Sequence, residues 1–171
     1  MFEQVRADYQ RHGRSLTNTA FWAILTYRYG VWANKLQPKL TRWLASKIYG
    51  FLFFIVNISS GIRLYREVTL GSDFHLIHSG NISIHPQTII GDRCGIQHGV
   101  TIGINMERQG VPTIGDDVYI GTGAVILGPI NIGDGARISA NSLVIMDVPA
   151  GATAIGVPAR ILKYTGRSSA K

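Results

Sequence analysis

Histidine is the residue type in this chain best suited to acid–base chemistry. Four of the five histidines fall within one short segment: His75, His78, His85 and His98. A neutral imidazole accepts a proton from a hydroxyl group near pH 7 when a neighbouring group holds its ring. The segment therefore predicts a general base that activates a hydroxyl, and we take His78 and His98 as the catalytic candidates.

A six-residue repeat supplies the elements that must position these side chains. Aliphatic residues recur every six positions at Ile114, Ile120, Ile126, Ile132, Ile138 and Val144. An α-helix repeats near 3.6 residues and a strand near 2, so neither explains this period. A hexapeptide solenoid does, because each repeat is a short strand with a turn, and repeats must stack to bury their apolar sides. The sequence thus predicts an all-β parallel β-helix in which three repeats close one triangular coil.

The repeat also predicts where the two histidines lie. It continues upstream through Leu76, Ile84, Ile90, Ile96 and Ile102, with two extra residues within 79–83. His78 and His98 each hold the third position of a repeat, one coil and the two-residue insertion apart. They are expected on one face of adjacent coils, about 4.8 Å apart as neighbouring strands are. The alternative is that both imidazoles only line a turn and bond backbone carbonyls.

The repeat is interrupted once and ends before the C-terminus. Residues 103–113 contain Gly, Asn, Glu, Arg and Pro, and predict an extruded loop of the kind that serves a site. Residues 160–163 are expected to cap the last coil. We expect three parts: an N-terminal α-helical region over 1–60, the β-helix over 61–163 and a tail over 164–171.

The first sixty residues predict three helices. Apolar spacing indicates helices over 2–12, over about 21–36, and from Pro38 to a break at residues 59–61. The third has an apolar side that we expect to pack on another subunit, the solenoid end or a membrane surface. Its most apolar run, residues 48–58, is shorter than the roughly 20 residues of a spanning helix, so we expect a buried or interfacial helix.

Positive charge is concentrated in the same region. The net charge is +7: residues 1–66 have ten Lys and Arg against two acids, and residues 67–171 have seven against eight. A basic patch of this kind suits an anionic membrane face or a phosphorylated glycan carrier better than nucleic acid. A solvated basic face without a partner is the alternative. No secretory signal is visible, so we expect a cytoplasmic protein, peripheral at the inner membrane face.

Other reaction classes lack their signatures. The chain has no Gly-x-Ser-x-Gly elbow and no phosphate-binding Gly-x-x-x-x-Gly-Lys-Ser/Thr loop. The one cysteine, Cys94, holds the small-residue position of a repeat, so we expect a buried apolar role for it. A single cysteine allows no internal disulfide, which suits a reducing compartment.

Several segments resemble a known family. They are FHLIHSG at 74–80, IQHGVTIG at 96–103, IGDDVYIGTGAVILG at 114–128, ISANSLV at 138–144 and GVPAR at 156–160. Over roughly residues 62–163 the chain resembles the serine acetyltransferase branch of the hexapeptide acyltransferases, and in particular the exopolysaccharide variants of the colanic acid type. The resemblance implies a left-handed β-helix, packed as a homotrimer with sites in the grooves between subunits.

The same resemblance implies roles for individual residues. Acetyl-CoA would lie in the groove as co-substrate, and an acceptor hydroxyl, activated by His78 as base, would attack the thioester directly. Either His98 or His85 would orient His78. The implied CoA contacts are Gly103, Ile104, Gly121, Thr122, Gly123, Ala140, Arg160 and Lys163. The substrate-binding candidates are His85, Arg63 and Arg108, and no resident metal is expected.

The chain departs from serine acetyltransferases at the expected acceptor site. Ile77 replaces an Asp before the base, Arg63 replaces a second Asp, and Gly110-Val111 replaces an Arg-His pair that holds the amino acid. A carboxylate buried without a cationic partner is penalised by several kcal/mol. Arg108 can substitute for that partner, so serine is not excluded.

These departures lead to a first hypothesis and three alternatives. The first is acetyl transfer to a sugar hydroxyl of an exopolysaccharide precursor, a carbohydrate acceptor either free or lipid-linked. The second is serine O-acetylation. The third is a zinc-dependent hydratase with His75, His78 and His98 as ligands. The fourth is a non-enzymatic scaffold whose N-terminal region binds a membrane.

Overall fold

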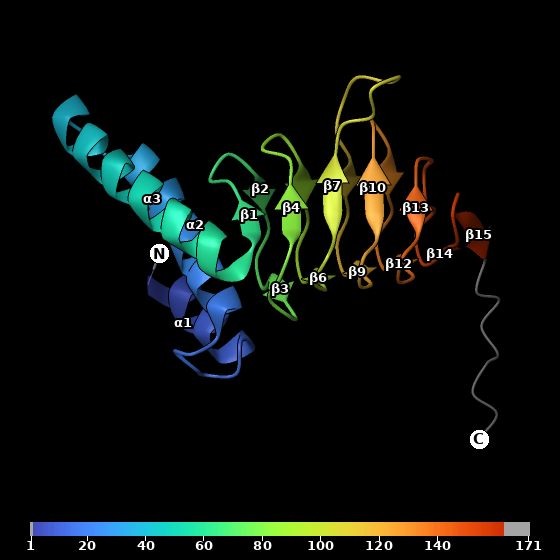
Figure 1. Cartoon of the computed structure of the whole chain (residues 1–171), viewed down its shortest axis with the longest axis horizontal. Helices are drawn as coiled ribbons and strands as arrows, with labels where there is room; N and C mark the ends of the chain where they lie inside the picture. Colours follow the sequence, from blue (N-terminus) through green and yellow to red (C-terminus); the bar gives the residue numbers. More distant parts are fainter. Residues whose placement is uncertain (1, 163–171) are drawn as a thin grey trace.

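Three helices precede a long solenoid of stacked coils (Figure 1). The structure is a computed structural model that describes residues 2–162. The helices are α1 (Phe2–Arg11), α2 (Thr19–Asn34) and α3 (Lys39–Ser60). Lys163 and the predicted tail over 164–171 lie outside the described residues.

The solenoid has three walls, numbered here in chain order. The first wall contains β1 (Ile62–Leu64), β4 (Ile82–Ile84), β7 (Thr101–Gly103), β10 (Val125–Leu127) and β13 (Leu143–Val144). The second contains β2 (Thr69–Leu70), β5 (Ile89–Ile90), β8 (Thr113–Ile114) and β11 (Asn131–Ile132). The third contains β3 (His75–Leu76), β6 (Gly95–Ile96), β9 (Tyr119–Ile120), β12 (Arg137–Ile138), β14 (Thr153–Ile155) and β15 (Arg160–Leu162).

The coils stack with their aliphatic residues in register, as predicted. On the first wall Ile84 pairs with Ile102, Ile102 with Ile126, and Ile126 with Val144, all between parallel strands. These side chains are at most 1% exposed. Each buried aliphatic side chain contributes about 1.5–3 kcal/mol. The small residues four places on are also buried, and antiparallel β15 closes the last coil against β14.

The helix ends follow the predicted signals. The side chain of Asn18 caps α2 by accepting a hydrogen bond from the backbone N–H of Ala20 at 3.0 Å. Pro38 is the N-cap of α3, one residue before the helix begins. Gly61 ends α3 with φ 67°, and a Cβ there would lie 2.8 Å from the backbone nitrogen of Asn81.

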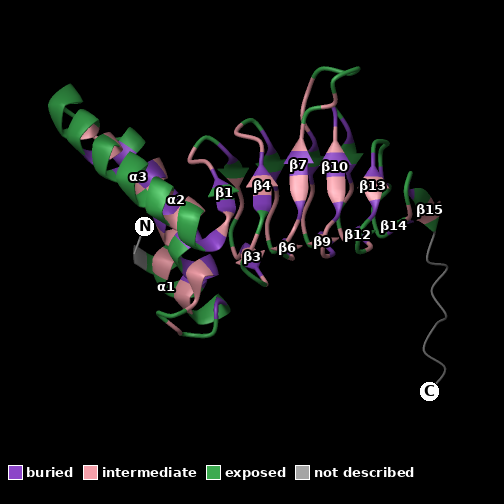
Figure 2. Cartoon of the chain, in the orientation of Figure 1, coloured by how far each residue is buried: buried purple, intermediate pink, exposed green. Residues whose placement is uncertain are grey.

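Helix α3 is longer than its most apolar run, and its apolar side is exposed. The most apolar run, residues 48–58, is too short to cross a bilayer. The whole helix of 22 residues is long and apolar enough to do so, judged by length and composition alone. Its contact face contains buried Ala45 and Tyr49, whereas the large apolar side chains on its opposite side are exposed (Figure 2). Within one chain the solenoid end therefore does not cover that apolar side, which leaves another subunit or a membrane surface of the three coverings expected.

Buried polar contacts join α1 to α2 and, through His12, to the first coil. Arg28 and Asp8 form an ion pair at 3.0 Å, with side chains 8% and 2% exposed. The ring of His12 donates from Nδ1 to the carbonyl of Asp8 at 2.7 Å and accepts at Nε2 from the backbone N–H of Leu76 at 3.2 Å. These two bonds require the neutral imidazole, because a doubly protonated ring has no acceptor.

Acid is expected to weaken this attachment. Burial lowers the pKa of His12, and burial followed by repulsion from His12 lowers the pKa of His75 to about 4. The unfolded chain takes up protons below its ordinary histidine pKa of about 6.5, while the folded chain resists them. The contribution of these two histidines to stability is therefore fully present above that pH, and it is lost as the pH falls toward about 4.

We expect the His75→Gln variant to show a shallower fall of melting temperature over this range than the wild-type protein. Thermal unfolding followed by circular dichroism at stepped pH values measures both slopes. An unchanged slope in both His75→Gln and His12→Gln would contradict the assignment.

Candidate active site

Register along the third wall brings four predicted site residues to one edge of the solenoid. Leu76 pairs with Ile96, Ile96 with Ile120, and Ile120 with Ile138. The residues two positions after each therefore form a column where the third wall turns into the first. We call this column the histidine edge: His78, His98, Thr122 and Ala140.

The two catalytic candidates meet at this edge. The ring centroids of His78 and His98 are 5.8 Å apart with planes inclined at 58°, and both side chains are exposed. The predicted register of the two histidines is thus confirmed. Gly99, with φ 74°, turns the chain directly after His98, and the backbone N–H of Gly123 donates to the carbonyl of His98 at 3.0 Å.

A polar network below His98 was not predicted from the sequence. The hydroxyl of Thr122 donates to Oε1 of Gln97 at 2.7 Å, and Nε2 of Gln97 donates to the hydroxyl of Tyr119 at 2.5 Å. The six-residue register that places His98 beside Thr122 also places Gln97 near Tyr119, so the repeat could have predicted this network. The network fixes the side chain of Thr122 at the edge where CoA contacts are expected.

Helix α2 contacts the turn that carries His78. The hydroxyl of Thr19, the first residue of α2, donates to the hydroxyl of Ser79 at 2.5 Å. The N-terminal region therefore supports the histidine edge as well as covering the end of the solenoid.

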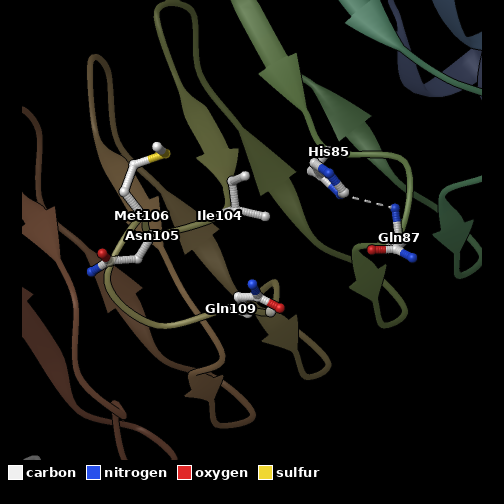
Figure 3. A pocket seen from close by; sticks show the side chains of 7 residues that line it. His85, Gln87, Ile104, Asn105, Met106 and Gln109 are labelled. Atoms are coloured by element: carbon white, nitrogen blue, oxygen red, sulfur yellow. Dashed lines mark hydrogen bonds between the residues drawn. The ribbon is translucent and has the colours of Figure 1, made fainter.

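The predicted loop protrudes at a second edge, where the first wall turns into the second (Figure 1). His85 lies here, one residue after β4, and its Nδ1 accepts from the backbone N–H of Gln87 at 3.3 Å (Figure 3). A cavity of about 420 Å³ separates His85 from the loop and is lined by His85, Gln87, Ile104, Asn105, Met106, Gln109 and Gly110. A neighbouring cavity of about 470 Å³ runs along the first wall past Thr101, Gly103 and Leu127.

The predicted site residues thus divide between two edges. His85 follows β4 whereas His78 precedes it, so the first wall separates them and His85 does not orient His78 of the same chain. Gly103 and Ile104 share the edge of His85, while Gly121, Thr122, Gly123 and Ala140 share the edge of His78.

The cationic candidates lie elsewhere. Arg63 is exposed on the first wall, where it pairs with Ser83 of the next coil. Arg108 is exposed on the protruding loop and is not among the residues that line the loop cavity. Arg160 is exposed on β15 near the last coil, and Lys163 lies outside the described residues.

His75 is turned toward the helices. Its ring is 5.1 Å from that of His12, whereas His78 faces His98. Within residues 2–162 no three His, Cys, Asp or Glu side chains are placed to share a metal ion.

Comparison with known proteins identifies the family. A family model described as bacterial transferase hexapeptide (six repeats) matches residues 112–145. The serine acetyltransferase of Bacillus subtilis is 34% identical over 154 residues, covering 86% of this chain and 70% of the relative. The chain belongs to the hexapeptide-repeat transferases, in their serine acetyltransferase-like branch. It is an acyltransferase with acetyl-CoA as co-substrate.

Solved structures agree with this assignment. The serine acetyltransferase of Brucella abortus superimposes with a TM-score of 0.78 at 29% identity, covering 97% of this chain and 70% of that one. The same enzyme in complex with coenzyme A gives the same TM-score over 96% of this chain and 68% of that one. The predicted fold, a left-handed parallel β-helix with N-terminal helices, is therefore confirmed.

The first hypothesis about the acceptor is wrong. An exopolysaccharide sugar was preferred because Ile77, Arg63 and Gly110-Val111 replace expected polar residues. The relatives found by sequence, from Bacillus subtilis to Synechococcus elongatus at 29% identity over 97% of this chain, are instead serine acetyltransferases. That hypothesis gives replacements at these few positions more weight than similarity along the whole chain. Family membership likewise favours acyl transfer over the zinc hydratase.

Cys94 is expected to be chemically inert in the folded protein. Burial raises the pKa of its thiol to about 11, and its side chain is fully buried. We expect iodoacetamide to leave native protein unmodified near neutral pH and to alkylate it after unfolding in guanidinium. Mass spectrometry measures both, and rapid labelling of native protein would contradict the burial.

Proposed function

We propose that this enzyme is a serine O-acetyltransferase, which transfers the acetyl group of acetyl-CoA to the hydroxyl of L-serine. The observation that carries the proposal is the pair of imidazoles on the histidine edge, in a chain whose relatives carry that name. A hydroxyl acceptor needs a base, and an exposed imidazole beside a second ring is suited to that role.

His78 is the proposed base and His98 its positioning partner. His78 takes the proton of the serine hydroxyl as the hydroxyl oxygen bonds to the acetyl carbonyl carbon. The carbon–sulfur bond then breaks, and the departing thiolate takes the proton back from His78. The products are O-acetylserine and CoA, and the base returns to its starting state. Acetyl-CoA supplies the acetyl group as an activated thioester.

The division of site residues supports a homotrimer with sites between subunits. The first wall separates the histidine edge from the edge of Gly103 and Ile104. One CoA molecule touches both sets most simply when the histidine edge of one copy faces the loop edge of another. In this arrangement Gly121, Thr122, Gly123 and Ala140 contact CoA from one side. Arg160 would meet its phosphates.

The acceptor carboxylate also needs a cationic partner. The loop carries Arg108, and Arg63 lies on the first wall, so each is a candidate to hold serine from either side of the proposed groove. His85, beside the loop cavity, is a third substrate-binding candidate.

We place the enzyme in the cytoplasm, in line with its serine acetyltransferase relatives. A peripheral position at the inner membrane face is consistent with the basic N-terminal region.

The direct test is an assay of purified full-length protein with acetyl-CoA and L-serine, following thiol release. We expect saturable CoA release with O-acetylserine formed in equal amount, and no comparable release with L-alanine, which lacks the hydroxyl. If L-serine gave no more release than L-alanine while acetyl-CoA still bound, serine would be excluded as the acceptor.

Replacing the base should affect turnover more than binding. We expect His78→Asn to lower kcat by 10²-fold or more, since general-base catalysis contributes typically 10²–10⁴-fold. CoA affinity by calorimetry and the melting temperature should stay near the wild-type values. A variant with near-normal kcat would remove His78 from the mechanism.

A further inference from the structure

The outer side of α3 is an apolar surface that no other element covers within residues 2–162. Eight large side chains form it, with exposed fractions between 47% and 69%: Leu40, Trp43, Leu44, Ile48, Phe51, Phe54, Ile55 and Ile58. At 100° per residue they fall within an arc of about 140° opposite Tyr49. We call this set the outer face of α3. Only one polar residue, Lys47, lies within the same arc.

The neighbouring helix extends this surface. Trp22 and Trp32 of α2 are 43% and 39% exposed. Between the helices lies an apolar groove of about 230 Å³, lined by Trp22, Leu25, Thr26, Tyr29 and Leu52. Soluble monomers rarely expose apolar patches of more than a few hundred Å², and larger ones mark interaction sites.

The charge around this surface indicates an anionic partner. Between Asp8 and Glu67 the chain has no acidic residue. The same stretch contains nine basic residues: Arg11, Arg14, Arg28, Lys35, Lys39, Arg42, Lys47, Arg63 and Arg66. Lys47 lies with its ammonium 5.6 Å from the centre of the Trp43 ring, so a cation and an aromatic side chain share the outer face. Aromatic side chains with nearby Lys or Arg are typical of helices in a membrane interface.

A two-fold contact between two copies fits this surface poorly. Such a contact between two outer faces would bring Lys47 of both copies close together. No carboxylate of α2 or α3 is available to offset this repulsion, because these helices have none. An anionic bilayer offsets it, since each Lys or Arg near such a surface contributes about 1 kcal/mol.

Contacts on the inner side of α3 oppose a spanning orientation. The backbone N–H of Arg66 donates to the hydroxyl of Tyr49 at 3.1 Å, and its guanidinium donates to the hydroxyl of Ser46 at 3.1 Å. The guanidinium also lies 4.8 Å from the centre of the Tyr49 ring. These bonds join the middle of α3 to the start of the solenoid. A helix crossing the bilayer would take Arg66 into the hydrocarbon or lose these contacts.

We propose that α3 lies flat on the surface of a bilayer that contains anionic lipids, with its outer face at the boundary between headgroups and acyl chains. Lys39 and Lys47 meet the headgroup phosphates, and the groove between α2 and α3 accepts part of an acyl chain. The solenoid, which extends away from α3, stays in water with its histidine edge (Figure 1). The enzyme is then held at the membrane independently of its reaction.

Flotation of the full chain with vesicles tests the proposal. We expect binding to vesicles of phosphatidylcholine with phosphatidylglycerol, weak binding to phosphatidylcholine alone, and loss of binding as salt rises. The triple variant Phe51→Ser, Phe54→Ser, Ile58→Ser should bind more than tenfold more weakly, because it removes three exposed apolar side chains that the bilayer would bury. Lys39→Gln and Lys47→Gln should each weaken binding roughly fivefold.

A matched control is available on the solenoid. Ile89 of β5 is 47% exposed, the same fraction as Ile55 on α3. Ile89→Ser should therefore leave vesicle binding unchanged, whereas Ile55→Ser weakens it. Both variants should keep the wild-type acetyl transfer rate, which makes a failure of the membrane proposal distinguishable from a failure of the proposed serine reaction.

Three outcomes would overturn the proposal. The first is equal binding to neutral and anionic vesicles. The second is bound protein that resists extraction by alkaline carbonate, which would show that α3 spans the bilayer. The third is a triple variant that binds vesicles normally but has a smaller mass in sedimentation, which would show that the outer face joins copies of the chain.

Discussion

The stacking of aliphatic residues inside a three-sided coil is the constraint on which the rest of the structure depends. Each coil buries its isoleucines only when the next coil presents its own at the same height, so strands must pair in parallel and in register. The same register that fills the interior fixes which residues share an outer edge. His78 and His98 meet because Leu76 and Ile96 are neighbours inside. In this fold the register of the strands therefore determines both the packing of the core and the pairing of the two histidines.

The N-terminal helices add what the repeat cannot. A solenoid leaves its first coil uncovered, and α1 and α2 cover it through specific polar contacts as well as apolar ones. His12 accepts a hydrogen bond from the backbone of Leu76, two residues before His78. Tyr27 donates from its hydroxyl to the carbonyl of Val68 at 2.8 Å. The cover of the first coil and the support of the histidine edge are thus the same set of contacts.

Sequence reasoning succeeded where a period controls the structure. Counting in sixes located the coils, the protruding loop and the pairing of two histidines, because register is a linear property of the chain. It misplaced His85, although the same count puts that residue beyond the next strand. The contact between His12 and Leu76 joins residues 64 positions apart, and no local pattern marks it. An apolar helix side can be read from spacing, but spacing does not say whether another element covers it, as α3 shows. The acceptor was misjudged because a few replaced side chains outweighed likeness along the whole chain.

The protruding loop has a consequence for how such enzymes diversify. Between β7 and β8 the chain leaves the stack and returns, and Ile102 still pairs with Ile126 beyond it. The excursion therefore adds residues to one corner without shifting any coil by a single position. Its length and composition can change during evolution while His78 and His98, on the opposite border of the wall, stay aligned. Changes in this loop can therefore alter the residues near one corner while the register of the coils stays the same.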